Sequence, residues 1–170
     1  MLRLAIIADR IDRVTAAIGR AAAWLALAVV LVQFTVVALR YTFGIGSIWL
    51  QETILYAHAG LFMLAAAWTL AVDGHVRVDI FYTAASARQK AWIDLLGTLL
   101  FLLPFMAALL VLSLPYVSRA WVVLERSREA SGLPFLYLLK TLIPLFALLM
   151  LLQGAALAIR AARVLATEPR

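Results

Sequence analysis

The sequence contains no cysteine among its 170 residues. Disulfide bridges, thiolate metal sites and thiol catalysis are therefore excluded. Charged residues are also scarce: they make up 14% of the chain, whereas a soluble domain has about 25%. Hydrophobic residues account for 66%, more than the core of a soluble protein of this length can bury. The composition therefore predicts an integral membrane protein.

Four stretches of the chain hold no Asp, Glu, Lys or Arg. Each has 19 to 24 residues, and about 20 helical residues are enough to cross the hydrocarbon core of a bilayer. Because only a helix satisfies its backbone polar groups within one such segment, the predicted fold class is an all-α integral membrane protein with four transmembrane helices. The predicted spans are residues 21–39, 53–72, 95–118 and 141–159, in a membrane domain over 20–163 that precedes a short cytoplasmic tail at 164–170.

The Lys and Arg residues outside the spans predict the orientation. Ten of the fifteen fall on the side that carries both termini, and five fall on the other side. Since cytoplasmic loops are enriched in Lys and Arg, we expect both termini to be cytoplasmic. The net charge of +6 comes with no basic stripe and no recognition motif, so we expect contacts to membrane lipids and no nucleic-acid partner.

Residues 1–19 have a different pattern. Apolar side chains recur every three or four residues, and charged residues fill the other positions. This pattern predicts a short amphipathic helix that lies on the cytoplasmic surface before the chain turns into the first span. The alternative is a simple extension of the first helix. The apolar residues in question are Leu4, Ile7, Ile11, Val14 and Ile18.

Polar side chains are rare inside the predicted spans, where each is costly. His58 is the one residue there of the usual acid, base or metal-binding types, with Gln33 and Gln153 as lone amides. His58 could act as a proton relay or haem ligand, or as a neutral imidazole hydrogen-bonded to a neighbouring helix, which we favour. A bis-histidine haem needs a second imidazole at matching depth, and the other histidine, His75, lies beyond the span.

The stretch DGHVRVD, residues 73–79, places Asp73, His75, Arg77 and Asp79 at every second position. The two aspartates and the histidine could bind a metal ion, but the charge of Arg77 would oppose a cation on the same side. A β-strand would have the right alternation, but no second strand is available to pair with it. We therefore favour an ordered cytoplasmic corner between the second and third spans.

The turn between the first two spans, RYTFGIGSIWLQE, is flanked by Arg40 and Glu52. These two residues could pair with each other, with lipid headgroups or with a partner protein. Trp49 lies three residues before Glu52 and so on the same side of a helix start. A solvated turn at the membrane surface is an equally good interpretation.

Three motifs, RYTFG…WLQE, DGHVRVDIFY and SGLPFLYLLKTLIP, occur in this order. So arranged, the chain from about Arg40 to Gln153 resembles the small membrane subunit (Q-type, DctQ-like) of tripartite ATP-independent periplasmic (TRAP) transporters. Position 51 is Gln where many relatives carry an acid. The resemblance implies no catalytic, substrate-binding or metal site. The candidate subunit-interface or structural residues are Arg40, Trp49, Glu52, His75, Arg77, Asp79, Ser131, Gly132, Pro134 and Lys140.

The resemblance implies an accessory subunit of the bacterial inner membrane that is not an enzyme and has no cofactor of its own. A periplasmic solute-binding protein would capture a small organic acid or related solute, and a large multi-span transport subunit would import it with a sodium gradient. The chief rival is a membrane anchor of a respiratory oxidoreductase, which requires haem or quinone ligation. A third interpretation, a self-sufficient exporter acting as a homo-oligomer, would require an intramembrane carboxylate.

Overall fold

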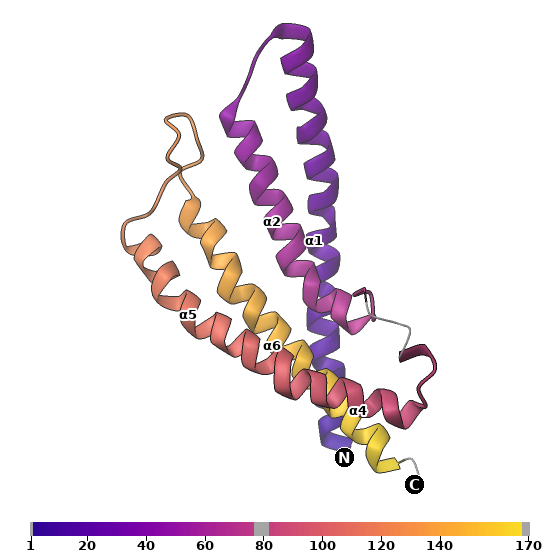
Figure 1. The fold of residues 1–170 in the computed structure, drawn as a ribbon. Helices are drawn as coiled ribbons and strands as arrows, with labels where there is room; N and C mark the ends of the chain where they lie inside the picture. Colours follow the sequence, from indigo (N-terminus) through magenta and orange to yellow (C-terminus); the bar gives the residue numbers. More distant parts are fainter. Residues whose placement is uncertain (1, 77–81, 168–170) are drawn as a thin grey trace.

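The computed structural model describes residues 2–76 and 82–167. The chain forms long helices, and no strand is present in these two ranges (Figure 1). The elements are α1 (Leu2–Phe43), α2 (Ile48–Ala71), α4 (Ala87–Gly97), the π-helical turn η1 (Thr98–Leu102), α5 (Leu103–Val122) and α6 (Leu136–Thr167).

Within the described residues, four helical segments are long and apolar enough to cross a membrane, as the charge-free stretches predict. They extend beyond the predicted spans, since the third runs through α4, η1 and α5 for 36 residues and α6 has 32. The fourth also continues into the predicted tail, because α6 ends only at Thr167. The segments are Arg3–Phe43, Ile48–Ala71, Ala87–Val122 and Leu136–Thr167.

The N-terminal residues do not form the separate amphipathic helix that we expected. Residues 2–43 are one continuous helix of 42 residues, which corresponds to the alternative of an extended first helix. No proline interrupts this segment, and proline is the residue that most reliably breaks a helix. Contacts between α1 and α6 hold the extension against the rest of the bundle.

Small residues, not the predicted apolar face, make the buried side of this extension. Ala5, Ala8 and Thr15 are buried, whereas the larger Leu4 and Ile7 are exposed. Helices in membranes associate through small residues because these let two backbones approach closely. In this part of α1, the periodicity of the large apolar side chains therefore does not identify the side of the helix that packs against the bundle.

Two antiparallel helix pairs, α1–α2 and α5–α6, build the bundle (Figure 1). Helix α6 packs against α1, α2, α4 and α5, so it joins the two pairs. The core lies where they meet and contains Ala67 of α2, Met106 of α5 and Leu149 and Met150 of α6. Both termini lie at the same end of the molecule (Figure 1).

The third segment bends through a widened turn. The N–H of Leu103 donates to the carbonyl of Thr98, five residues earlier, and η1 ends there. Pro104 follows directly; it has no N–H, and its ring would clash with the carbonyl four residues before it. A π-helical turn relieves this clash. The continuous curve from α4 into α5 in Figure 1 follows from it.

Helices α2 and α5 both end in a Schellman motif. After α2, Asp73 has φ 55° and the N–H of Gly74 donates to the carbonyl of Thr69 at 2.8 Å. After α5, Leu124 has φ 45° and the N–H of Glu125 donates to the carbonyl of Ala120 at 2.9 Å. These motifs end the second span at the predicted corner and the third span at the loop before α6.

Candidate functional site

Glu52, in the first turns of α2, joins that helix to the loop between α5 and α6. One carboxylate oxygen accepts a hydrogen bond from the Ser127 hydroxyl, and the other accepts the backbone N–H of Leu133 at 2.5 Å. Leu133 is buried, so its N–H would otherwise have no partner in the protein interior. The carboxylate therefore fastens the two helix pairs together. We call Glu52, Ser127, Gly132 and Leu133 the Glu52 lock.

Gly132 belongs to this lock because a side chain there would not fit. A Cβ atom at position 132 would clash with the Ser127 side chain and lie 2.7 Å from the nearer Glu52 oxygen. The loop also closes on itself, since the N–H of Ser127 donates to the carbonyl of Leu133 at 3.1 Å. Of the neighbouring candidates, Ser131 is exposed and Pro134 is half-buried.

Lys140, in the first turns of α6, points back toward the end of α5. Its ammonium group lies 2.5 Å from a Glu125 carboxylate oxygen and 4.2 Å from the centre of the Tyr116 ring. Beside it, the Trp121 indole N–H donates to the Thr141 hydroxyl at 2.8 Å. Lys140 thus pairs within the chain and fixes α5 against α6 near the Glu52 lock.

A second polar cluster lies near the termini and joins α1 to α6. Gln153 is completely buried: its amide oxygen accepts the Thr15 hydroxyl at 2.9 Å, and its amide nitrogen donates to Asp12 at 2.8 Å. The other Asp12 oxygen binds the Arg160 guanidinium at 2.5 Å. We call Asp12, Thr15, Gln153 and Arg160 the Gln153 lock.

Sequence reasoning noted Gln153 as a lone amide but missed its partners. Asp12 lies four residues after the buried Ala8 and three before the buried Thr15, so the side of α1 that packs on α6 already includes it. A carboxylate on the packed side of a helix needs a partner. That spacing is the signal that could have revealed the Gln153 lock.

Several predicted residues stand apart from both locks. Arg40 is exposed in the last turn of α1, and its side chain does not pair with Glu52. Trp49 is 52% exposed at the start of α2. His75 is exposed after α2, and the predicted corner residues Arg77 and Asp79 lie outside the described residues.

His58 does not bond to a neighbouring helix of the bundle, contrary to expectation. Its side chain is exposed on α2 and has no hydrogen-bond partner in the described ranges. The Gln33 side chain on α1 is likewise exposed. Helix α2 uses small residues such as Gly60 to approach α1, because a Cβ atom there would lie 3.0 Å from Leu25.

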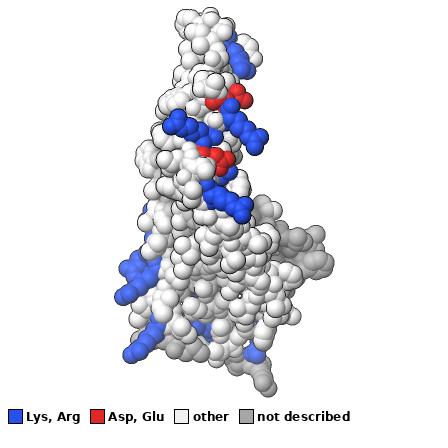
Figure 2. Space-filling view, turned by 90° about the vertical axis from the view of Figure 1, so that its left-hand side faces the viewer, with Lys and Arg blue, Asp and Glu red and all other residues white. Residues whose placement is uncertain are grey.

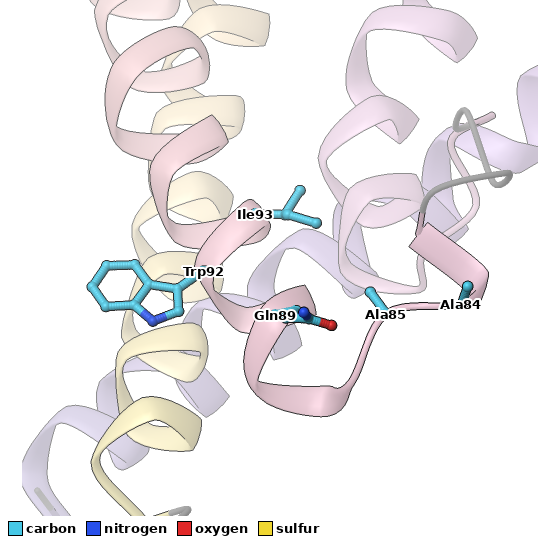
Figure 3. A pocket seen from close by; sticks show the side chains of 5 residues that line it. All are labelled: Ala84, Ala85, Gln89, Trp92 and Ile93. Carbon is cyan, nitrogen blue, oxygen red and sulfur yellow. The ribbon is translucent and has the colours of Figure 1, made fainter. Parts of the chain in front are cut away.

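A hollow of about 470 Å³ lies between α4 and the segment before it (Figure 3). It is lined by Ala84, Ala85, Gln89, Trp92 and Ile93. The Gln89 side chain is already used, since its oxygen accepts the N–H of Ser86 at 2.9 Å in the capping box of α4. The remaining lining is mainly apolar and carries no acid or base, so the hollow offers surface for contact and no group for chemistry.

Charges gather at the ends of the bundle. On the face that Figure 2 shows, Asp and Glu are interleaved with Lys and Arg toward the end that carries the loop between α5 and α6, and the charged side chains visible toward the other end are Lys and Arg. The arrangement of the described residues can therefore fix helices to one another and meet headgroups or partners at the membrane surfaces.

One protein family matches the chain: tripartite ATP-independent periplasmic transporters, DctQ component, over residues 29–164. The matched region covers all of α2, α4, η1 and α5, most of α6 and the last part of α1, from residue 29 onward. It includes the Glu52 lock, Lys140 and two of the four residues of the Gln153 lock. Neither a curated protein nor a solved structure matches the sequence.

Proposed function

Because the chain belongs to the DctQ component family of tripartite ATP-independent periplasmic transporters, we propose that it is the accessory scaffold subunit of a sodium-coupled importer. Its partners are a large multi-span transport subunit and a periplasmic solute-binding protein, and the solute is a small organic acid or a related compound. The chain itself holds no cofactor; the sodium gradient is used by the whole complex.

The observation that carries this proposal is how the chain uses its buried polar groups. In the Gln153 lock, side chains of α1 and α6 bond to one another, and Gln153 is completely buried. In the Glu52 lock, the carboxylate on α2 accepts the Ser127 hydroxyl and the backbone N–H of Leu133 from the loop before α6. Groups engaged in this way hold helices in fixed positions. A fixed four-helix body suits a subunit against which another protein moves.

The apolar helices and the distribution of Lys and Arg support a location in the membrane. The four apolar helices make the chain a multi-pass membrane protein. The sequence assigns ten of the fifteen Lys and Arg residues to the predicted side of the two termini, and both termini lie at one end of the bundle (Figure 1). These facts support a bacterial inner-membrane protein with a cytoplasmic N-terminus and C-terminus. The same end holds the Gln153 lock, which would then lie near the cytoplasmic surface.

The experiment is affinity purification of the tagged full chain from its native membrane in mild detergent, followed by identification of the proteins that elute with it. The proposal predicts a large multi-span membrane protein in stoichiometric amount. Elution with a haem- or iron–sulfur-containing subunit and a Soret band would instead favour the rival, a membrane anchor of a respiratory oxidoreductase. Elution of this chain by itself would contradict the proposal.

A further inference from the structure

Helix α2 carries a row of exposed side chains along the side that contacts neither α1 nor α6. Successive members are three or four residues apart, so they form one straight stripe along the helix. Phe62 is 71% exposed and Leu55 is 55% exposed. We call this row the α2 stripe; its members are Ile48, Gln51, Leu55, His58 and Phe62.

The α2 stripe places hydrogen-bonding groups where lipid would otherwise lie. His58 is ten residues into a helix of 24, close to the middle of the span, and Gln51 lies two turns before it on the same side. Acyl chains supply neither donor nor acceptor, so an imidazole or amide facing them is costly. A partner that returns hydrogen bonds would remove this cost.

The half of the bundle formed by η1, α5 and α6 does not expose polar side chains in this way. In the described residues, the exposed side chains in the middle of η1, α5 and α6 are apolar, for example Phe101 and Leu112, each 74% exposed. Three polar side chains of that half, Thr98, Ser113 and Gln153, are buried, and its exposed polar side chains, such as Ser118, lie toward the end of α5. The α1–α2 pair, in contrast, exposes Gln33 besides the two polar residues of the stripe. The composition of α5 suits lipid, and that of α2 suits protein.

The spacing of the stripe residues and the hollows beside them agree with packing against another helix. Spacings of three, four, three and four residues are those of helices that pack at a crossing angle of about 20°. A hollow of about 410 Å³ flanks one end of the stripe, lined by Ile48, Gln51, Glu52, Leu55 and Glu129. Another, of about 370 Å³, includes Phe62 and lies at the other end. Side chains of a second helix could enter both hollows.

Resting on the function proposed above, we infer that the α2 stripe is the surface that binds the large transport subunit. A membrane-spanning helix of that subunit lies along the stripe and presents hydrogen-bonding side chains at the depths of Gln51 and His58. It presents basic or donor groups to the hollow that contains Glu52 and Glu129.

Charge separates this occupant from a second copy of the chain. A two-fold axis along the membrane normal would place the stripe against itself at equal depth. The hollow lined by Glu52 and Glu129 would then face the same two carboxylates, and like charges oppose association. The side chain of Glu129 has no partner in the described residues, so its charge is available to a cation of a different protein.

Because the chain has no cysteine, a single introduced cysteine is its one thiol and can be labelled selectively. Single variants Leu55→Cys and Phe62→Cys on the stripe, with Leu112→Cys on α5 and Phe101→Cys on η1 as controls, are made in the full complex. A thiol-reactive benzophenone is attached to each and activated by light in native membranes. The inference predicts cross-links to the large subunit from the two stripe positions, whereas the two control positions label lipid.

Two outcomes would overturn the inference: cross-links to the large subunit from the control positions but not from the stripe, or a stripe product with twice the mass of this chain. If the wild-type chain assembled with no large subunit at all, the proposed function itself would be wrong.

A second measurement tests the two polar side chains of the stripe. The double variant Gln51→Leu with His58→Leu should keep the thermal stability of the isolated chain but weaken its association with the large subunit about three- to tenfold. Unchanged association would contradict the role given to these two side chains.

Discussion

The Glu52 lock makes a prediction about the stability of the isolated chain. Replacing Glu52 with Gln keeps the size of the side chain but leaves one acceptor oxygen for two donors. Those donors, the Ser127 hydroxyl and the Leu133 N–H, each bind a separate carboxylate oxygen in the structure. One of them must therefore lose its partner, and the other exchanges a charged acceptor for a neutral one.

The size of the effect follows from these two bonds. A hydrogen bond to a charged group contributes about 1.5–3 kcal/mol to stability and a neutral one about 0.5–1.5 kcal/mol. Because Glu52 is only half-buried, the lower values apply, and Glu52→Gln should cost about 2 kcal/mol. Glu52→Ala should cost about 3–4 kcal/mol, because it also leaves the N–H of Leu133, a residue that is 7% exposed, without an acceptor.

The assay is equilibrium unfolding of the purified chain in mixed micelles, followed by the fluorescence of its five tryptophans. The matched control is Glu129→Gln, a change of the same type at an exposed side chain in the same loop; it should alter the free energy of unfolding by less than about 0.5 kcal/mol. Equal stability of Glu52→Gln and the wild type would refute the reasoning, as would an equal loss in both variants.

Three further changes can be measured in the same way. Gly132→Ala should destabilise the chain by about 1–3 kcal/mol, because its Cβ would lie 2.7 Å from Glu52; an unchanged unfolding curve would show that the loop has room. Gln153→Leu should cost about 1–3 kcal/mol, because Thr15 and Asp12 each lose a buried partner. Gln33→Leu, at an exposed amide, is its control and should have little effect; equal losses would argue against the Gln153 lock. Leu124→Gly should stabilise the chain by about 1 kcal/mol, because residue 124 has φ 45° and its side chain is 56% exposed. A loss of stability there would mean that the Leu124 side chain packs usefully.

The four spans could be predicted because charge is excluded from lipid so strongly that its absence marks each helix. The resemblance based on three short motifs is confirmed by the family match over residues 29–164. Glu52 and Gly132 were also named from the sequence, but only as members of two separate motifs. Glu52 reaches the loop of Gly132 through a hydrogen bond from the backbone N–H of Leu133, and the residue type does not show which backbone N–H will donate to a distant side chain.

Two expectations failed for a common reason. The pattern of large apolar residues in 1–19 predicted a helix on the membrane surface, whereas Ala8 and Thr15 pack against the bundle within one long helix. His58 was expected to bond within the bundle, whereas it is exposed. In lipid, large apolar residues gain little by turning inward, so size and polarity do not reveal which side of a helix meets another helix.

The central claim is that this chain supports transport without carrying the solute itself. The most direct measurement is uptake into proteoliposomes, under a sodium gradient, of the solute that the periplasmic binding protein captures. The membranes would contain this chain alone, the large subunit alone, or both together with the binding protein. The account predicts uptake only when both membrane subunits are present, and uptake by this chain alone would contradict it.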